Sequence, residues 1–116
     1  MDFNKSDTAV LITDPQNDFL SEQGVIWGLV DESVKENGTI ANIETLMKAA
    51  KDNGYQVFIS PHYYFPTDRS WQFGGTVENM MHEVKMFDRT GALDLDGFSG
   101  SGADWLEQYK PLIDDG

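Results

Sequence analysis

Asp14 is the residue of this sequence whose type and position best suit catalysis. It directly follows the aliphatic and β-branched run 8–13, which is typical of a buried strand. A carboxylate at the carboxyl end of such a strand is partly desolvated and can act as a general base. An aspartate here can equally form a turn by bonding to backbone amides, so position alone leaves both roles open. We expect the nearby Asp18 to brace or cap the loop.

His62 follows a second apolar run, 56–60, and its imidazole could bind a metal or exchange a proton. A metal site needs several convergent ligands, but Ser60 is a poor ligand and His82 lies on a predicted helix, where we expect it to face solvent. Aromatic residues after His62 either line a pocket for a flat or apolar group or anchor the loop onto the core. These aromatic residues are Tyr63, Tyr64, Phe65, Trp71 and Phe73.

Two strands and a helix must position these residues. Run 8–13 ends at Asp14-Pro15, and run 56–60 ends at Pro61. Between them, apolar residues recur at helical spacing from Thr39 until Asn53-Gly54 gives a stop signal. A strand, helix and strand in this order predict a right-handed βαβ unit with parallel strands. Asp14 and the segment leading to His62 then lie at the sheet edge where α/β proteins bind ligands.

The other segments give weaker signals. Residues 16–37 show no sustained period and predict a long connection, and residues 65–75 predict an aromatic-rich loop. A helix is expected over Thr76 to Phe87, followed by a Gly- and Asp-rich stretch over 88–102. A short helix is expected over Trp105 to Tyr109, stopped by Pro111. Two strands are too few for a stable open sheet.

Composition excludes several functions. The 116 residues hold 8 Lys plus Arg against 20 Asp plus Glu, a formal net charge of -12, so we expect no binding to nucleic acid or to anionic membranes. The longest apolar run is too short for a signal peptide or a membrane span, which favours a cytoplasmic protein. The absence of cysteine excludes a disulfide, a thiolate metal site and a cysteine nucleophile within these residues.

Two stretches resemble a known family. Residues 8–20, TAVLITDPQNDFL, resemble the first strand of the isochorismatase-like cysteine hydrolases, which ends in a D-x-Q-x-D-F pattern. That pattern is matched by Asp14, Gln16, Asp18 and Phe19. Residues 59–73, ISPHYYFPTDRSWQF, resemble the segment after the second strand, where a His and aromatic residues border the active site. The resemblance implies an α/β fold, a three-layer Rossmann-like parallel sheet with helices on both faces, with 1–116 as a single domain forming its N-terminal part.

The same resemblance implies a catalytic triad of Asp, Lys and Cys acting on an amide, carbamoyl or enol-ether bond of a small molecule. In this scheme the Cys attacks, the Asp takes the thiol proton and passes it to the leaving group, and the Lys supports the thiolate. The Asp is carried over onto Asp14. Lys85, in a predicted helix, and Lys110, near a predicted turn, do not follow strands and are not substitutes for the Lys. Candidate pocket residues are Gln16, Phe19, His62, Tyr64 and Trp71.

Family members that bind a metal, the nicotinamidases, have an Asp-x-His pair after the second strand. Here the stretch is Ser60-Pro61-His62, which lacks the carboxylate, so we expect no metal and no cofactor. Without a cysteine, the 116-residue chain is predicted to be inactive alone, and we expect a homo-oligomer or pairing with the missing half. The alternatives are an acidic receiver-like signalling module and a truncated binding or scaffold chain completed by another chain.

Overall fold

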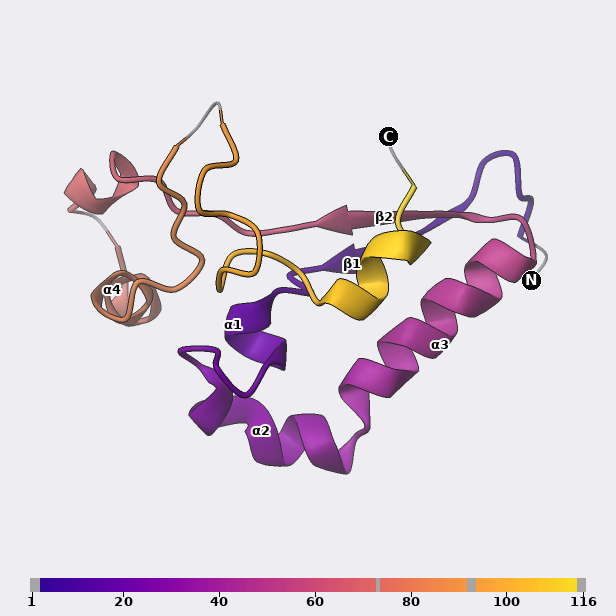
Figure 1. The fold of residues 1–116 in the computed structure, drawn as a ribbon, viewed down its shortest axis with the longest axis horizontal. Helices are drawn as coiled ribbons and strands as arrows, with labels where there is room; N and C mark the ends of the chain where they lie inside the picture. Colours follow the sequence, from indigo (N-terminus) through magenta and orange to yellow (C-terminus); the bar gives the residue numbers. More distant parts are fainter. Residues whose placement is uncertain (1–2, 73, 92–93, 115–116) are drawn as a thin grey trace.

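A pair of parallel strands forms the centre of the fold (Figure 1). The computed structural model describes residues 3–72, 74–91 and 94–114. Their elements, in chain order, are β1 (Ala9–Thr13), α1 (Asn17–Leu20), α2 (Trp27–Glu36), α3 (Thr39–Asp52), β2 (Gln56–Ser60), the 3-10 helix η1 (Asp68–Ser70), α4 (Thr76–Glu83) and the 3-10 helix η2 (Glu107–Leu112). The predicted α/β class and the parallel β1–α3–β2 unit are confirmed.

The residues on either side of α3 explain where the helix begins and ends. Gly38 precedes the helix in the left-handed conformation, with φ 59°, which a residue without a Cβ adopts easily. At the other end the Asn53 backbone N–H donates to the Ala49 and Ala50 carbonyls, and Gly54 turns the chain toward β2 with φ 76°. The strands then pair in register, with Ala9 opposite Gln56 and Thr13 opposite Ser60. Their carboxyl ends therefore lie side by side.

The larger hydrophobic cluster lies between one face of this sheet, α3 and η2. Its buried members are Leu20, Met47, Ala50, Val57, Leu106 and Tyr109. Because side chains alternate along a strand, Val10 and Ile12 of β1 pack against this cluster, while Leu11 on the other face is 59% exposed. Ile26, Met86 and Phe87 form a second cluster, and Phe19 packs against both clusters. Figure 1 shows α4 and α3 at opposite ends of the molecule.

The prediction of an irregular connection over residues 16–37 is wrong, because α1 and α2 occupy much of it. In α2 the half-buried apolar positions that pack against the clusters are Val30 and Val34, a stripe too thin to give a clear period. An ion pair between Lys35 and Asp31, one turn apart, adds support. Short helices of this kind depend on tertiary contacts more than on their own sequence pattern.

Two helices in the second half of the chain have limits that differ from the prediction. The predicted helix 76–87 ends at Glu83 because Lys85 and Phe87 adopt positive φ, 57° and 56°, which reverses the chain and buries Phe87. Trp105 remains extended because it forms an antiparallel bridge with Gln16, so the last helix begins at Glu107 rather than at Trp105. Pro111 lies inside η2 and does not stop it, since the Ile113 N–H still bonds to the Lys110 carbonyl.

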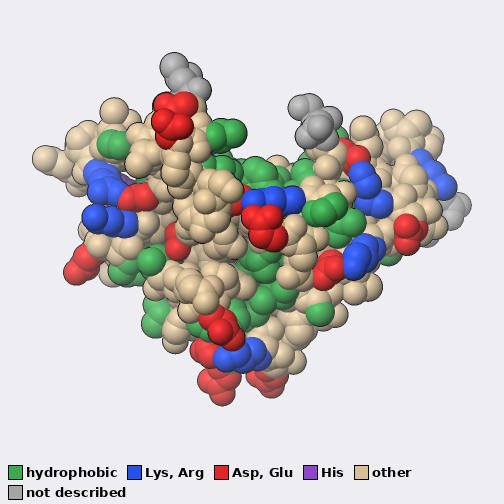
Figure 2. Space-filling model, in the orientation of Figure 1, with side chains coloured by type: hydrophobic (Ala, Val, Ile, Leu, Met, Phe, Trp, Pro, Cys, Tyr) green, Lys and Arg blue, Asp and Glu red, His purple; other side chains and the backbone are tan. Residues whose placement is uncertain are grey.

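The surface carries charges of both signs. Figure 2 shows acidic and basic side chains interspersed over the face in view, with apolar side chains between them. Within the described part of the chain, no helix has the length and apolar character needed to cross a membrane.

Candidate functional site

Asp14 lies at the carboxyl end of β1, beside the end of β2. Its backbone N–H donates to the Ser60 carbonyl across 3.0 Å, which extends the strand ladder by one bond. The residue has φ 51°, in the left-handed region that aspartate enters more readily than most residues. Its side chain is exposed. This turn therefore presents the carboxylate at the sheet edge, next to the segment that leads from Ser60 to His62.

Gln16 holds that segment in place. Its side chain is fully buried, and its Oε1 accepts from the His62 N–H at 2.8 Å while its Nε2 donates to the His62 carbonyl at 2.8 Å. The same Nε2 donates to the Ala103 carbonyl at 2.7 Å. Both polar atoms of the amide are thus engaged with backbone. Gln16 positions the His62 backbone but does not line the pocket described below.

Asp18 links three segments through its buried carboxylate. Oδ2 accepts from the Phe87 N–H at 2.7 Å and Oδ1 from the Val25 N–H at 3.3 Å. The Asp18 N–H donates to the Gly102 carbonyl, and a Cβ at Gly102 would lie 2.0 Å from Oδ1, so this close approach requires glycine. The prediction that Asp18 braces the loop is confirmed.

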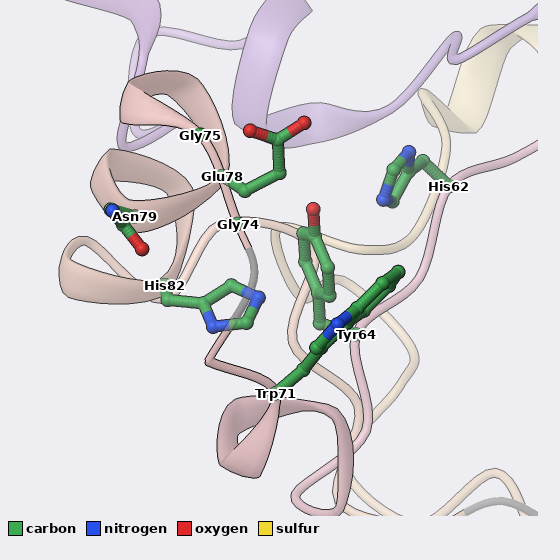
Figure 3. Close-up of a pocket in the computed structure, with 8 residues that line it drawn as sticks. All are labelled: His62, Tyr64, Trp71, Gly74, Gly75, Glu78, Asn79 and His82. Carbon is green, nitrogen blue, oxygen red and sulfur yellow. The ribbon is translucent and has the colours of Figure 1, made fainter.

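The candidate pocket is a hollow of about 320 Å³ between the segment after β2 and the first turns of α4. It brings together His62, Tyr64 and Trp71 with five further residues: Gly74, Gly75, Glu78, Asn79 and His82 (Figure 3). The Tyr64 ring lies 4.7 Å from the His62 ring and 4.5 Å, edge to face, from the His82 ring. Figure 3 shows the Glu78 carboxylate on the same side of the hollow as the Tyr64 hydroxyl and His62.

Burial and the neighbouring negative charges keep the tyrosine of this pocket protonated. Burial raises the pKa of the Tyr64 phenol, and the charges of Glu78 and Asp68 raise it further. The phenol therefore stays neutral at physiological pH and can donate a hydrogen bond from the pocket wall.

The α4 side of the pocket is missing from the sequence-based prediction. Glu78 and Asn79 are not among the predicted site residues, and the expectation that His82 faces solvent is wrong, because its half-buried ring packs on Tyr64. A signal exists, since Glu78 and His82 are one helical turn apart and share a face of α4. What the spacing cannot give is the direction of that face.

The other aromatic residues anchor the loops. Phe19 packs on Phe87 with ring centroids 5.6 Å apart, away from the lining of the pocket. The Arg89 guanidinium stacks on the rings of Tyr63 and Phe65, at 4.9 Å and 5.7 Å from their centroids. Burial raises the pKa of Tyr63, against the opposing effect of Arg89. Of the predicted aromatic series, Tyr64 and Trp71 line the pocket, and Phe73 lies outside the described residues.

Neither of the two lysines considered above follows a strand. Lys85 lies beyond the end of α4 rather than inside a helix. Lys110 lies in η2 rather than near a turn, and its Nζ donates to the buried Asp104 carboxylate at 2.7 Å and to Glu107. Among the residues described, no group of three or more His, Asp or Glu side chains is arranged to hold a metal ion.

These features define an α/β domain in which Asp14 lies at the carboxyl ends of the parallel strands, the edge where α/β proteins bind ligands. The candidate pocket lies farther along the chain, between the segment after β2 and α4, and Asp14 is not among its described lining residues. The family model for the isochorismatase domain matches residues 8–115, so the chain belongs to the isochorismatase family, which is a hydrolase-like family. The match gives no support to the receiver-like or scaffold alternatives. A search of curated proteins finds no match for the chain.

Proposed function

We propose that this domain serves a hydrolase that cleaves a C–N bond, as in an amide or carbamoyl group, or an enol-ether bond of a small molecule. Asp14 is the proposed general base. The observation that supports this role is the turn after β1, where the bond from Asp14 N–H to Ser60 holds an exposed carboxylate beside the segment leading to His62. The family match over residues 8–115 supports the reaction class.

The proposed chemistry needs a nucleophile that these residues lack. In a cysteine hydrolase the thiolate attacks the substrate carbon, and a base takes the thiol proton and returns it to the leaving group. The 116 residues contain no cysteine, so we propose that the Cys and its supporting Lys come from protein outside them. The 116-residue protein alone is then inactive, and pairing with another chain or segment completes the site. A small-molecule substrate, an oligomeric assembly and a cytoplasmic location belong to the same proposal.

Complementation tests this proposal. The 116-residue protein is mixed with the C-terminal half of a complete isochorismatase-family hydrolase, which supplies Lys and Cys, and turnover of amide, carbamoyl and enol-ether substrates is measured. We expect no turnover by either part alone, turnover by the mixture, and its loss when Asp14→Asn is used or when the helper's cysteine is replaced by serine. Losing one member of a catalytic triad typically lowers kcat by several orders of magnitude.

A matched control separates catalysis from folding. Asp7→Asn changes another exposed aspartate near β1 and leaves turnover by the mixture unchanged. Turnover that survives Asp14→Asn contradicts the role of Asp14 as base. Turnover by the 116-residue protein alone contradicts the need for an external nucleophile.

A further inference from the structure

The described walls of the pocket beside α4 combine aromatic rings with a carboxylate. Two large aromatic rings, Tyr64 and Trp71, and two imidazoles, His62 and His82, line it together with the Glu78 carboxylate. Among its described lining residues there is no Lys and no Arg. The formal charge of the side chains around the hollow is therefore negative while the histidines are neutral. An anionic ligand has no cationic partner on these walls.

We propose that this pocket binds a small organic cation, a protonated or quaternary amine. Aromatic faces attract such cations through the negative charge above the ring plane, and tryptophan does so most strongly. Glu78 adds a carboxylate on the same side as the Tyr64 hydroxyl, so the cation meets a full negative charge as well as ring faces. The charge of Glu78 also reaches Tyr64, since it contributes to raising the pKa of that phenol.

The size of the pocket limits the ligand. A volume of about 320 Å³ lies at the lower end of the range of roughly 300–1,000 Å³ that is usual for small-molecule sites. Trp71 is 69% exposed, so its ring is accessible to a ligand that enters from solvent. A compact ammonium head with a short polar tail suits these dimensions better than a long chain does.

This binding does not depend on the proposed hydrolase reaction. The lining residues named above include neither Asp14 nor a cysteine, so neither is needed to hold the cation. A failure to bind cations would leave the role of Asp14 untouched, and a failure of complementation would leave the cation site untouched. The two proposals can therefore be judged separately.

Titration of the 116-residue protein with choline tests the site, with 3,3-dimethyl-1-butanol as a probe of the same shape but without charge. Calorimetry at pH 8, where histidine side chains are ordinarily neutral, gives both affinities. We expect choline to bind and its neutral counterpart to bind several-fold more weakly. Trp71→Ala should raise the Kd of choline by roughly 2- to 30-fold, the range for a cation over an aromatic ring.

Matched variants distinguish the pocket from the rest of the surface. Trp71→Phe keeps a ring and should bind choline with an intermediate Kd, and Glu78→Gln should raise the Kd by roughly 1.5- to 5-fold. Leu29→Ala, at a residue 75% exposed on α2, and Glu83→Gln, at an exposed position of α4, should leave it unchanged. All four substituted residues are exposed, so far-UV circular dichroism should show each variant folded. Absent choline binding, equal binding of the neutral probe, or a Kd unaffected by Trp71→Ala would overturn the proposal.

Discussion

The β1–α3–β2 unit and the pocket region, residues 61–91, are held together in different ways. The unit rests on regular backbone bonds, with five pairs of residues in register between the strands and a cluster of buried side chains beneath them. The pocket region has a single α-helix, α4, among its described residues, and much of it is fixed by scattered bonds between loops. Tyr64, for example, donates its N–H to the Phe87 carbonyl and accepts from the Arg89 N–H.

The contrast shows where the stability of the candidate pocket comes from. Two buried side chains near the end of β1, Gln16 and Asp18, bond to backbone atoms of His62 and Phe87. These bonds span 46 and 69 residues of sequence, so the start of α1, just after β1, positions the pocket region through a few long-range contacts. Losing one such contact should loosen the pocket region before it affects the sheet.

The largest expected effect comes from emptying the second hydrophobic cluster. Phe87 is 1% exposed and contacts the rings of Phe19 and His62 at 5.6 Å each, so Phe87→Ala should lower the free energy of unfolding by about 3–5 kcal/mol. Urea denaturation measures the loss, and hydrogen exchange locates it. We expect amides of α4 to lose protection before those of α3. Leu95→Ala, at a residue 67% exposed, is the control and should change stability little.

Met47→Ala tests the β1–α3–β2 unit in the same way as Phe87→Ala tests the pocket region. Met47 is fully buried in the larger cluster, so its truncation should cost about 2–5 kcal/mol and lower protection in α3 itself. Equal loss of protection in α3 and α4 for both variants would show that the two regions unfold as one unit, against the contrast drawn above.

Removing the carboxylate of Asp18 should have a smaller effect, again on the pocket region. Asp18→Ala leaves the buried Phe87 N–H without an acceptor, which costs about 1–3 kcal/mol. Urea denaturation and the fluorescence of Trp71, which lines the pocket, provide the measurements. For the fluorescence, Trp27 and Trp105 are replaced by Phe in both proteins, so that the signal comes from Trp71 alone. Asp52→Ala, at an exposed aspartate of α3, should change neither. A Trp71 signal that is unchanged in Asp18→Ala would mean that other contacts suffice to position the pocket.

The sequence allowed the β1–α3–β2 unit to be predicted because its signals are local. Apolar spacing in α3 and the Asn53-Gly54 stop lie within the helix and its end, and parallel pairing follows from the order of the elements. From this the neighbourhood of Asp14 and Ser60 could be placed at one sheet edge. The thin apolar stripe of α2 gave too weak a local signal, so that helix was missed.

The contacts that shape the site could not be predicted in the same way. The partners of the Gln16 side chain, His62 and Ala103, are far away in sequence, and no pattern within a window of residues couples them. The early end of α4 depends on positive φ at Lys85 and Phe87, which neither residue type favours and which burial of Phe87 stabilises. Tertiary packing decides these features.

In the larger hydrophobic cluster beside the β1–α3–β2 unit, Tyr109 of η2 gives a test at alkaline pH. Its buried hydroxyl donates to the Ile40 carbonyl at 3.0 Å, and burial raises the pKa of Tyr109 to about 12. Tyr109→Phe should therefore cost about 0.5–1.5 kcal/mol near neutral pH. The raised pKa favours the neutral phenol in the fold, so this contribution holds below the ordinary value of 10 and declines as the pH rises toward 12. Absorbance titration of the phenolate, compared with the variant, should show the late step lost with Tyr109.

The smallest expected effect concerns Asp114, which joins the last described segment to β2 and α3. Its contribution to stability should be lost at acid pH. A hydrogen bond from Lys51, then one from the Val57 N–H, lowers the pKa of Asp114 below its usual 3.8. Because the folded pKa is the lower one, the contribution is complete above that value and is lost as the pH falls below it. The difference in stability between the protein and Asp114→Asn should thus be largest near neutral pH. It should shrink toward zero as the pH falls below 3.8. Asp52→Asn should show no such convergence, and a difference that persists in acid would assign the effect to the Val57 contact rather than to the charge.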